Sequence, residues 1–242
     1  MKIKIHFLFY IVALIFIITG MFRPFVWIFS LIIVHEIGHI LTGLFLKWKI
    51  DKVIITPFGC VTIFKECLNR SIKEELLIAI MGPIFQIMYF LIINKIVNYD
   101  WFYAANISLL LFNLLPIIPL DGSKIIHSIL DIFLTFKLSH NTVIIISFIL
   151  TILIGITCII NHNLLLIIAF ICLLIKIINE YNEKELRFQK YLLERYLYSF
   201  VFKKTIKIDS IKKMKRNNNH LIYFKNKWMS EKKYLKEHFK MK

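Results

Sequence analysis

The chain has 242 residues, of which 58% are hydrophobic, with 22 phenylalanines against only 7 glycines and 5 prolines. Together with a mean hydropathy of +0.70, this composition excludes an ordinary soluble globule and indicates a polytopic membrane protein. The net charge of +16 first raises nucleic acid as a partner, but 19 of the 31 Lys and Arg residues follow position 175. Membrane topology explains this skew with fewer assumptions. We therefore expect a lipid bilayer, and no nucleic acid, as a partner.

Six apolar segments are long enough, or nearly so, to cross a bilayer, which takes about 20 helical residues. They are residues 5–22, 25–46, 75–97, 101–120, 142–160 and 163–179. The expected fold is an all-α polytopic membrane protein whose core, residues 1–179, has six transmembrane helices. No small-residue cleavage site precedes Arg23-Pro24, so we expect the first segment to be retained as a span.

The basic residues are divided unevenly between the connections on the two sides of the membrane. Alternate connections, including both termini and residues 47–75, hold 29 Lys and Arg, whereas the others hold only Arg23 and Lys95. Because cytosolic loops are enriched in basic residues, we expect both termini to face the cytosol.

The connection between the second and third spans has a different character. Residues 49–66 contain two β-branched runs around Pro57-Phe58-Gly59, a pattern typical of a β-hairpin. We expect a small membrane-associated hairpin whose edge either pairs with an extended peptide or packs on the membrane surface. In the third span, Gly82-Pro83 is followed one turn later by Gln86, which indicates either a packing kink or a functional opening.

Two segments are expected to lie outside the bilayer. Residues 123–141 predict a short amphipathic surface helix, where nothing else converges on His127 and Asp131 to make a metal site. Residues 180–242 are predicted to be a short basic cytosolic tail that begins as a mixed-charge helix. The part after Lys203 is expected to be too short to form a sizeable core.

The second span contains the motif His35-Glu36-Ile37-Gly38-His39. On a helix, residues i and i+4 share a face, so both imidazoles can bind a single ion while Glu36 flanks it as a general base. Ionisable groups at membrane depth are costly and are functional by default. Since His39 precedes Lys47 by eight residues, the ion is expected roughly 12 Å below the cytosolic surface.

A catalytic zinc takes three protein ligands, so one more must come from another segment. The acidic residues near the cytosolic half of the membrane are Glu74, Glu75, Asp121 and Asp131. Asp121 alone follows a stretch that two prolines unwind, and we choose it as the third ligand. Asn113, at the start of this stretch, is placed to hold an extended peptide backbone, or else makes a structural hydrogen bond. The chemistry expected is metal-assisted hydrolysis of a peptide bond.

Two motifs together resemble the site-2 proteases, a family of intramembrane zinc metalloproteases. They are His35-Glu36-Ile37-Gly38-His39 and the ten residues from Asn113 to Gly122, Asn-Leu-Leu-Pro-Ile-Ile-Pro-Leu-Asp-Gly. Within the family, the resemblance is greatest to the members that act in sporulation. Pro57-Phe58-Gly59, Gly82-Pro83 and Leu192-Leu193-Glu194-Arg195-Tyr196 add to a likeness that covers about residues 1–200.

The resemblance implies one zinc per chain with His35, His39 and Asp121 as ligands, Glu36 as the catalytic base and Asn113 as a substrate contact. It also implies cleavage of a membrane-tethered precursor of the pro-sigma-K type during sporulation. The location would be the mother-cell membrane around the forespore, with inhibitory membrane proteins as further partners. The alternatives are an anti-sigma factor as substrate, a transporter with a polar midplane site, and a scaffold with a structural zinc.

The chain departs from the family pattern in two places. Ser123 and Lys124 follow Asp121-Gly122, where the family usually has a second glycine and an arginine. Many relatives also carry a cytosolic CBS domain, and the residues from Lys204 onward are expected to be too few for one.

Overall fold

The computed structural model describes residues 2–56, 59–65, 68–97, 99–162, 164–198, 200, 202, 204–224 and 226–240. The chain forms two compact units. The first comprises Met1–Glu66 and Leu77–Leu114, and the second Cys67–Leu76 and Leu115–Lys242. Residues Pro57 and Phe58 of the predicted hairpin turn lie outside the described residues.

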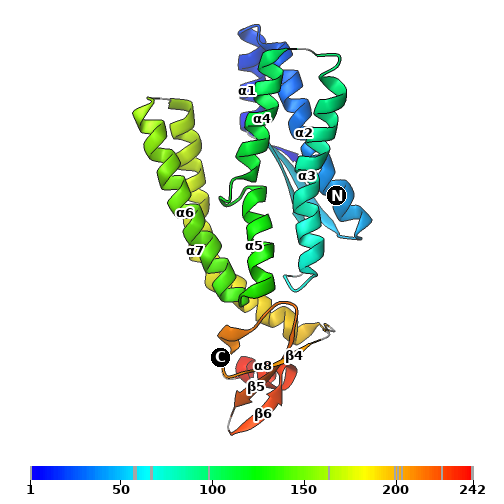
Figure 1. The fold of residues 1–242 in the computed structure, drawn as a ribbon, viewed down its shortest axis with the longest axis vertical. Coiled ribbons are helices and arrows are strands. Elements are labelled where there is room, and N and C mark those ends of the chain that lie inside the picture. The colour runs from blue at the N-terminus through cyan, green and yellow to red at the C-terminus, as the bar shows by residue number, and fades with distance from the viewer. Residues whose placement is uncertain are drawn as a thin grey trace. The chain divides into compact units, whose positions relative to one another are not determined.

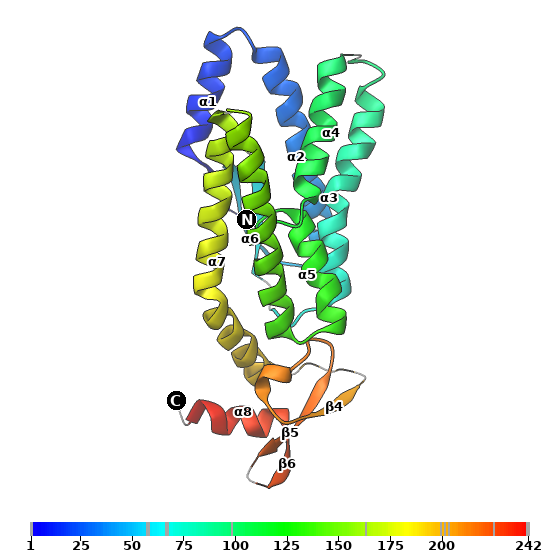
Figure 2. The ribbon, with the colours of Figure 1, turned by 60° about the vertical axis from the view of Figure 1, so that its left-hand side comes forward.

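The first unit contains four apolar helices (Figures 1 and 2). They are α1 (Phe7–Ile18), α2 (Phe22–Phe45), most of α3 (Ile72–Ile93) and α4 (Asp100–Leu114). The core between α2, α3 and α4 consists of Leu31, Phe90 and Phe102, together with Val97 from the connection after α3. At the crossing of α2 and α3, a Cβ added to Gly38 would lie 2.5 Å from the Met81 carbonyl oxygen, so the glycine lets the two backbones approach closely.

A three-stranded sheet completes this unit, in the order β1-β2-β3. The predicted hairpin is present as β2 (Ile50–Thr56) and β3 (Gly59–Phe64), which pair antiparallel with Ile54 opposite Val61. The added strand, β1 (Lys2–Ile5), pairs parallel with β2. The first span was predicted to begin at residue 5, but Lys-Ile-Lys-Ile has the period of two that is typical of a strand. The first helix therefore begins at Phe7.

The second unit is built around a helical hairpin. In it, α6 (Phe136–Ile160) and α7 (Leu164–Leu197) lie side by side, as both views show (Figures 1 and 2). Before them comes α5 (Asp121–Phe133), which confirms the predicted short helix. The Thr135 side chain caps α6 by accepting from the Leu138 N–H at 3.3 Å, so α6 begins six residues before the predicted span.

The predicted unwinding between the fourth span and Asp121 is confirmed. Helix α4 ends at Leu114, and α5 begins at Asp121. The Ser147 hydroxyl of α6 accepts from the Ile118 N–H at 3.1 Å and donates to the Pro116 carbonyl at 3.3 Å. A side chain thus satisfies backbone groups that the interrupted helix leaves open, as irregular backbone at membrane depth requires.

Among the described residues, three helices are long and apolar enough to cross a membrane: α2, α3 and α6. Helix α1 has 12 residues and α4 has 15, fewer than the roughly 20 that a perpendicular crossing takes. The chain is therefore a multi-pass membrane protein, mostly helical with small sheets.

The part of the basic tail after Lys203 is folded, which corrects the prediction that this part is too short to form a sizeable core. Strands β4 (Thr205–Ile208), β5 (Asn219–Phe224) and β6 (Lys227–Ser230) form a second sheet, with a 3-10 helix, η1 (Ile211–Lys213), after β4 and helix α8 (Glu231–Lys240) at the end. Its buried residues pack against α7 in one cluster, made of Phe136, Phe188, Tyr191, Leu192, Ile208, Met214, Ile222 and Leu235. The tail forms a core because α7 supplies part of it.

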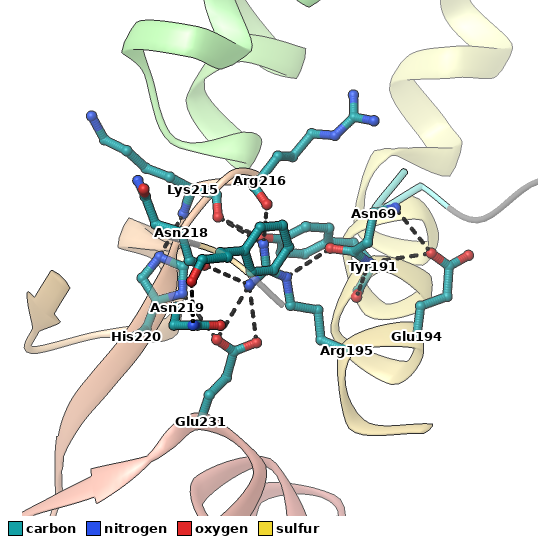
Figure 3. Close-up of polar contacts among 11 residues, drawn as sticks. Asn69, Tyr191, Glu194, Arg195, Lys215, Arg216, Asn218, Asn219, His220 and Glu231 are labelled. Carbon is teal, nitrogen blue, oxygen red and sulfur yellow. Dashed lines mark hydrogen bonds and ion pairs between the residues drawn. The ribbon is translucent and has the colours of Figure 1, made fainter. Parts of the chain in front are cut away.

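Arg195 of α7 joins the helix to this C-terminal sheet (Figure 3). Its Nε donates to the Asn69 side chain at 2.7 Å, and its Nη1 donates to the Asn218 carbonyl at 2.8 Å and to the Glu231 carboxylate at 3.2 Å. A buried guanidinium needs such a full set of partners. Arg195, one of the residues 192–196 noted in the sequence for their family likeness, thus links α7 to the folded tail.

The Glu231 carboxylate at the start of α8 is also bound by His220 at 3.1 Å. Burial alone would raise the pKa of Glu231, but the hydrogen bond from His220 and the charge of Arg195 outweigh it and lower that pKa. The carboxylate therefore stays ionised at neutral pH and keeps its ion pair with Arg195.

Candidate metal centre

The buried face of α2 presents the histidines of the predicted motif. His35, Gly38, His39 and Thr42 are all buried, at the three- and four-residue spacing of one helix face. The two imidazole Nε2 atoms lie 3.1 Å apart. The structure thus brings His35 and His39 together as predicted.

The other ring nitrogens of these histidines contact carbonyl oxygens on α3. His39 Nδ1 lies 2.7 Å from the Ile78 backbone oxygen, and His35 Nδ1 lies 3.0 Å from Gln86 Oε1. A carbonyl oxygen only accepts hydrogen bonds, so each Nδ1 is the donor and each Nε2 is the atom left to face a metal ion. Imidazole nitrogens are common zinc ligands, and the convergence of two of them therefore fits the metal.

Gly82 of α3, from the predicted Gly82-Pro83 break, lies directly against the imidazole rings of His35 and His39. A Cβ added at this position would meet His39 Nε2 at 2.3 Å and His35 Nε2 at 2.9 Å. The absence of a side chain lets the α3 backbone come up to the histidines, so the glycine has a defined steric role at the site. Helix α3 continues through Gly82 and Pro83, so the structure shows a close packing contact at this position and no opening in the helix.

Glu36 is buried on α2, next to the first histidine. Its charge reaches the Cys60 thiol on β3: burial and then the Glu36 carboxylate raise the pKa of Cys60 to about 11. In the absence of a metal ion the thiol is therefore protonated at neutral pH.

Asp121 and Asn113 stand at the two ends of the unwound connection. Asp121 is the first residue of α5, is buried, and pairs through Oδ1 with Lys124 Nζ at 2.7 Å. Asn113 is half-buried in the last turn of α4. The roles expected from the sequence, zinc ligand for Asp121 and substrate contact for Asn113, remain predictions.

His127 and Asp131, for which no metal site was expected, lie among other polar groups of the second unit. His127 Nδ1 lies 3.7 Å from the Asp131 carboxylate. That carboxylate is instead bound by Arg216 Nη1 at 2.8 Å and by the Ser139 hydroxyl. Asp131 is thus part of the ion-pair network of the second unit.

Two polar residues near the histidines had no role assigned from sequence. Gln86 was noted only as a polar group in an apolar run, and Asn106 of α4 was not noticed. Both are buried, and Gln86 Nε2 contacts Asn106 Oδ1 at 3.0 Å. The available signal was that each is an amide within a largely apolar stretch of helix, where polar groups mark function.

Comparison with known proteins agrees with this site. The profile of Peptidase family M50 matches residues 24–99 and 94–157. The chain therefore belongs to Peptidase family M50, the site-2 proteases, and is a zinc metalloendopeptidase of that type. This membership sets aside the transporter and the structural-zinc scaffold considered from the sequence.

Among similar proteins is Stage IV sporulation protein FB of Bacillus subtilis, 29% identical over 206 residues, or 81% of this chain and 72% of that protein. A zinc metalloprotease of Methanocaldococcus jannaschii is 30% identical over 119 residues, or 44% of this chain and 34% of that protein. The solved structure of a site-2 protease from the same archaeon matches with a TM-score of 0.58 and 22% identity, covering 74% of this chain and 89% of that one. This last likeness concerns the fold.

Proposed function

We propose that His35, His39 and Asp121 together hold the zinc ion and that Glu36 is the catalytic base. The observation that carries the proposal is the convergence of the two histidine Nε2 atoms, 3.1 Å apart on a buried helix face. Asp121 supports it as a buried carboxylate at the start of α5, directly after backbone that is free of helical geometry. Two imidazoles and one carboxylate make a three-ligand set of the catalytic kind.

The residues divide the work of peptide hydrolysis between them. Zinc, when bound, polarises the scissile carbonyl and lowers the pKa of water. Glu36 takes the proton from the attacking water and delivers it to the leaving amine. Asn113, with two donors and one acceptor, holds the substrate backbone at the end of α4.

The edge of the first sheet offers a place where an extended substrate peptide can bind. Strand β3 is at the end of the order β1-β2-β3 and packs against α2, where a Cβ added to Gly43 would lie 2.5 Å from the Phe64 ring. An extended substrate that adds to β3 by strand pairing would therefore lie beside the strand that packs against α2, the helix that carries the catalytic base.

The proposed substrate is a membrane-tethered transcription-factor precursor of the pro-sigma-K type, cleaved during sporulation. Its support is the similarity to Stage IV sporulation protein FB. The proposal includes six spans with both termini in the cytosol, for which the uneven distribution of Lys and Arg is the support. The enzyme would then act in the mother-cell membrane around the forespore, and inhibitory membrane proteins would control its activity.

Co-expression with candidate substrates tests this assignment. We expect the wild-type chain to shorten a membrane-tethered sigma-factor precursor and to leave an anti-sigma factor of similar size intact, measured by immunoblot. Cleavage of the anti-sigma factor alone would replace the sporulation assignment with the other site-2 protease substrate class. A precursor lacking its membrane tether serves as the control and should stay uncut.

A further inference from the structure

A chain of hydrogen bonds runs from α4 through α3 to the first histidine. Gln86 Nε2 of α3 lies 3.0 Å from Asn106 Oδ1 and 3.2 Å from the Asn106 backbone oxygen of α4. Gln86 Oε1 lies 3.0 Å from His35 Nδ1 on α2. Gln86 is 1% exposed and Asn106 is 4% exposed, so three helices are joined by buried polar contacts.

The direction of each bond follows from one group in the chain. The Asn106 backbone oxygen can only accept, so the Gln86 amide must turn its NH₂ towards α4. The Gln86 carbonyl oxygen is thereby turned towards His35 and can only accept from Nδ1. His35 must therefore donate from Nδ1, and in the neutral ring this leaves the lone pair on Nε2. The backbone of α4 thus dictates the tautomer of a histidine on α2.

We propose that Gln86 is a positioning residue for zinc binding and that Asn106 orients it, an inference that rests on the proposed role of His35 as a ligand. A second partner that accepts from the outer nitrogen of a ligating histidine fixes its tautomer and raises its basicity. Gln86 does this for His35 with an amide instead of the more usual carboxylate or backbone carbonyl.

The two histidines are oriented by different means. For His39 the acceptor is the backbone oxygen of Ile78, which no substitution removes. For His35 the acceptor is the Gln86 side chain, which a substitution can remove. A role in packing alone would not need a polar side chain in α3, since an apolar residue of similar volume packs in lipid-facing helices at lower cost.

The test compares zinc affinity among variants of the full-length, detergent-purified chain by competition with a chelator. Gln86→Met, which removes the strong acceptor at nearly the same length, is expected to weaken zinc binding by about 10- to 100-fold. Gln86→Glu, which keeps an oxygen for His35, is expected to bind zinc at least as tightly as the wild type. Tyr89→Phe is the matched control, because it removes a 2.9 Å hydrogen bond from the Tyr89 hydroxyl to Ser30 between the same two helices.

Each result has a defined meaning. Equal zinc affinity of wild type and Gln86→Met, or an equal loss in Tyr89→Phe, would overturn the positioning role. If Gln86→Met does not fold, as judged by the melting of metal-free protein, a weakened Gln86→Glu variant would overturn it instead. A wild-type chain without zinc at the histidines would contradict the proposed metal site itself, so the two failures are distinguishable.

Discussion

Glu36→Gln is expected to abolish cleavage of the membrane-tethered substrate while zinc remains bound. The substitution keeps the size of the side chain but removes the carboxylate that accepts a proton. Proton transfer by a positioned group contributes about 10²- to 10⁴-fold to rate, so we expect cleavage to fall by at least about 100-fold. The zinc content should not change, because Glu36 is not among the proposed ligands. Immunoblotting of the co-expressed substrate and metal analysis of the purified protein measure the two effects.

Glu183→Gln is the matched control, since Glu183 is an exposed residue of α7. It should cleave like the wild type. Unchanged cleavage in Glu36→Gln would rule out the carboxylate as the base. Loss of zinc in that variant would instead make Glu36 a ligand or a determinant of the fold.

Gly82→Ala is expected to weaken zinc binding and to lower activity with it, although alanine adds only one methyl group. The new Cβ would lie 2.3 Å from His39 Nε2 and 2.9 Å from His35 Nε2, so it occupies the space where the two lone pairs converge. Overpacking of this kind costs about 1–3 kcal/mol even in apolar cores. We expect zinc affinity to fall by at least about tenfold, with cleavage reduced in parallel.

A second glycine provides a control for crowding without contact with the metal ligands. A Cβ at Gly155 of α6 would lie 2.3 Å from the Phe170 ring. Gly155→Ala should therefore lower the melting temperature but leave the zinc affinity of the folded protein unchanged. If Gly82→Ala retains zinc, the approach of α3 to the histidines is not required for the site.

The sequence predicted the local parts of the site because each depends on residues close together in the chain. The spacing of His35 and His39 fixes a common helix face, and the prolines before Asp121 fix the end of α4. The contact between Gln86 and His35 joins residues 51 positions apart. No periodicity in either helix specifies such a partner.

The same reason explains the errors in the fold. The part of the tail after Lys203 is short, but the core in which it takes part includes Tyr191 and Leu192 of α7. A prediction made from the length of the tail alone therefore missed this core. Strand β1 exists because β2, about 50 residues later, offers it an edge. Both features depend on contacts between segments that are far apart in the sequence, and the residue pattern of a single segment does not predict such contacts.

The most direct test of the metal site is X-ray absorption at the zinc edge, together with the zinc content of the purified full-length chain. We predict one zinc per chain with two imidazole nitrogens and a carboxylate oxygen among its neighbours, and loss of that oxygen in Asp121→Ala. Folded protein without zinc, or a zinc environment that Asp121→Ala leaves unchanged, would contradict the account.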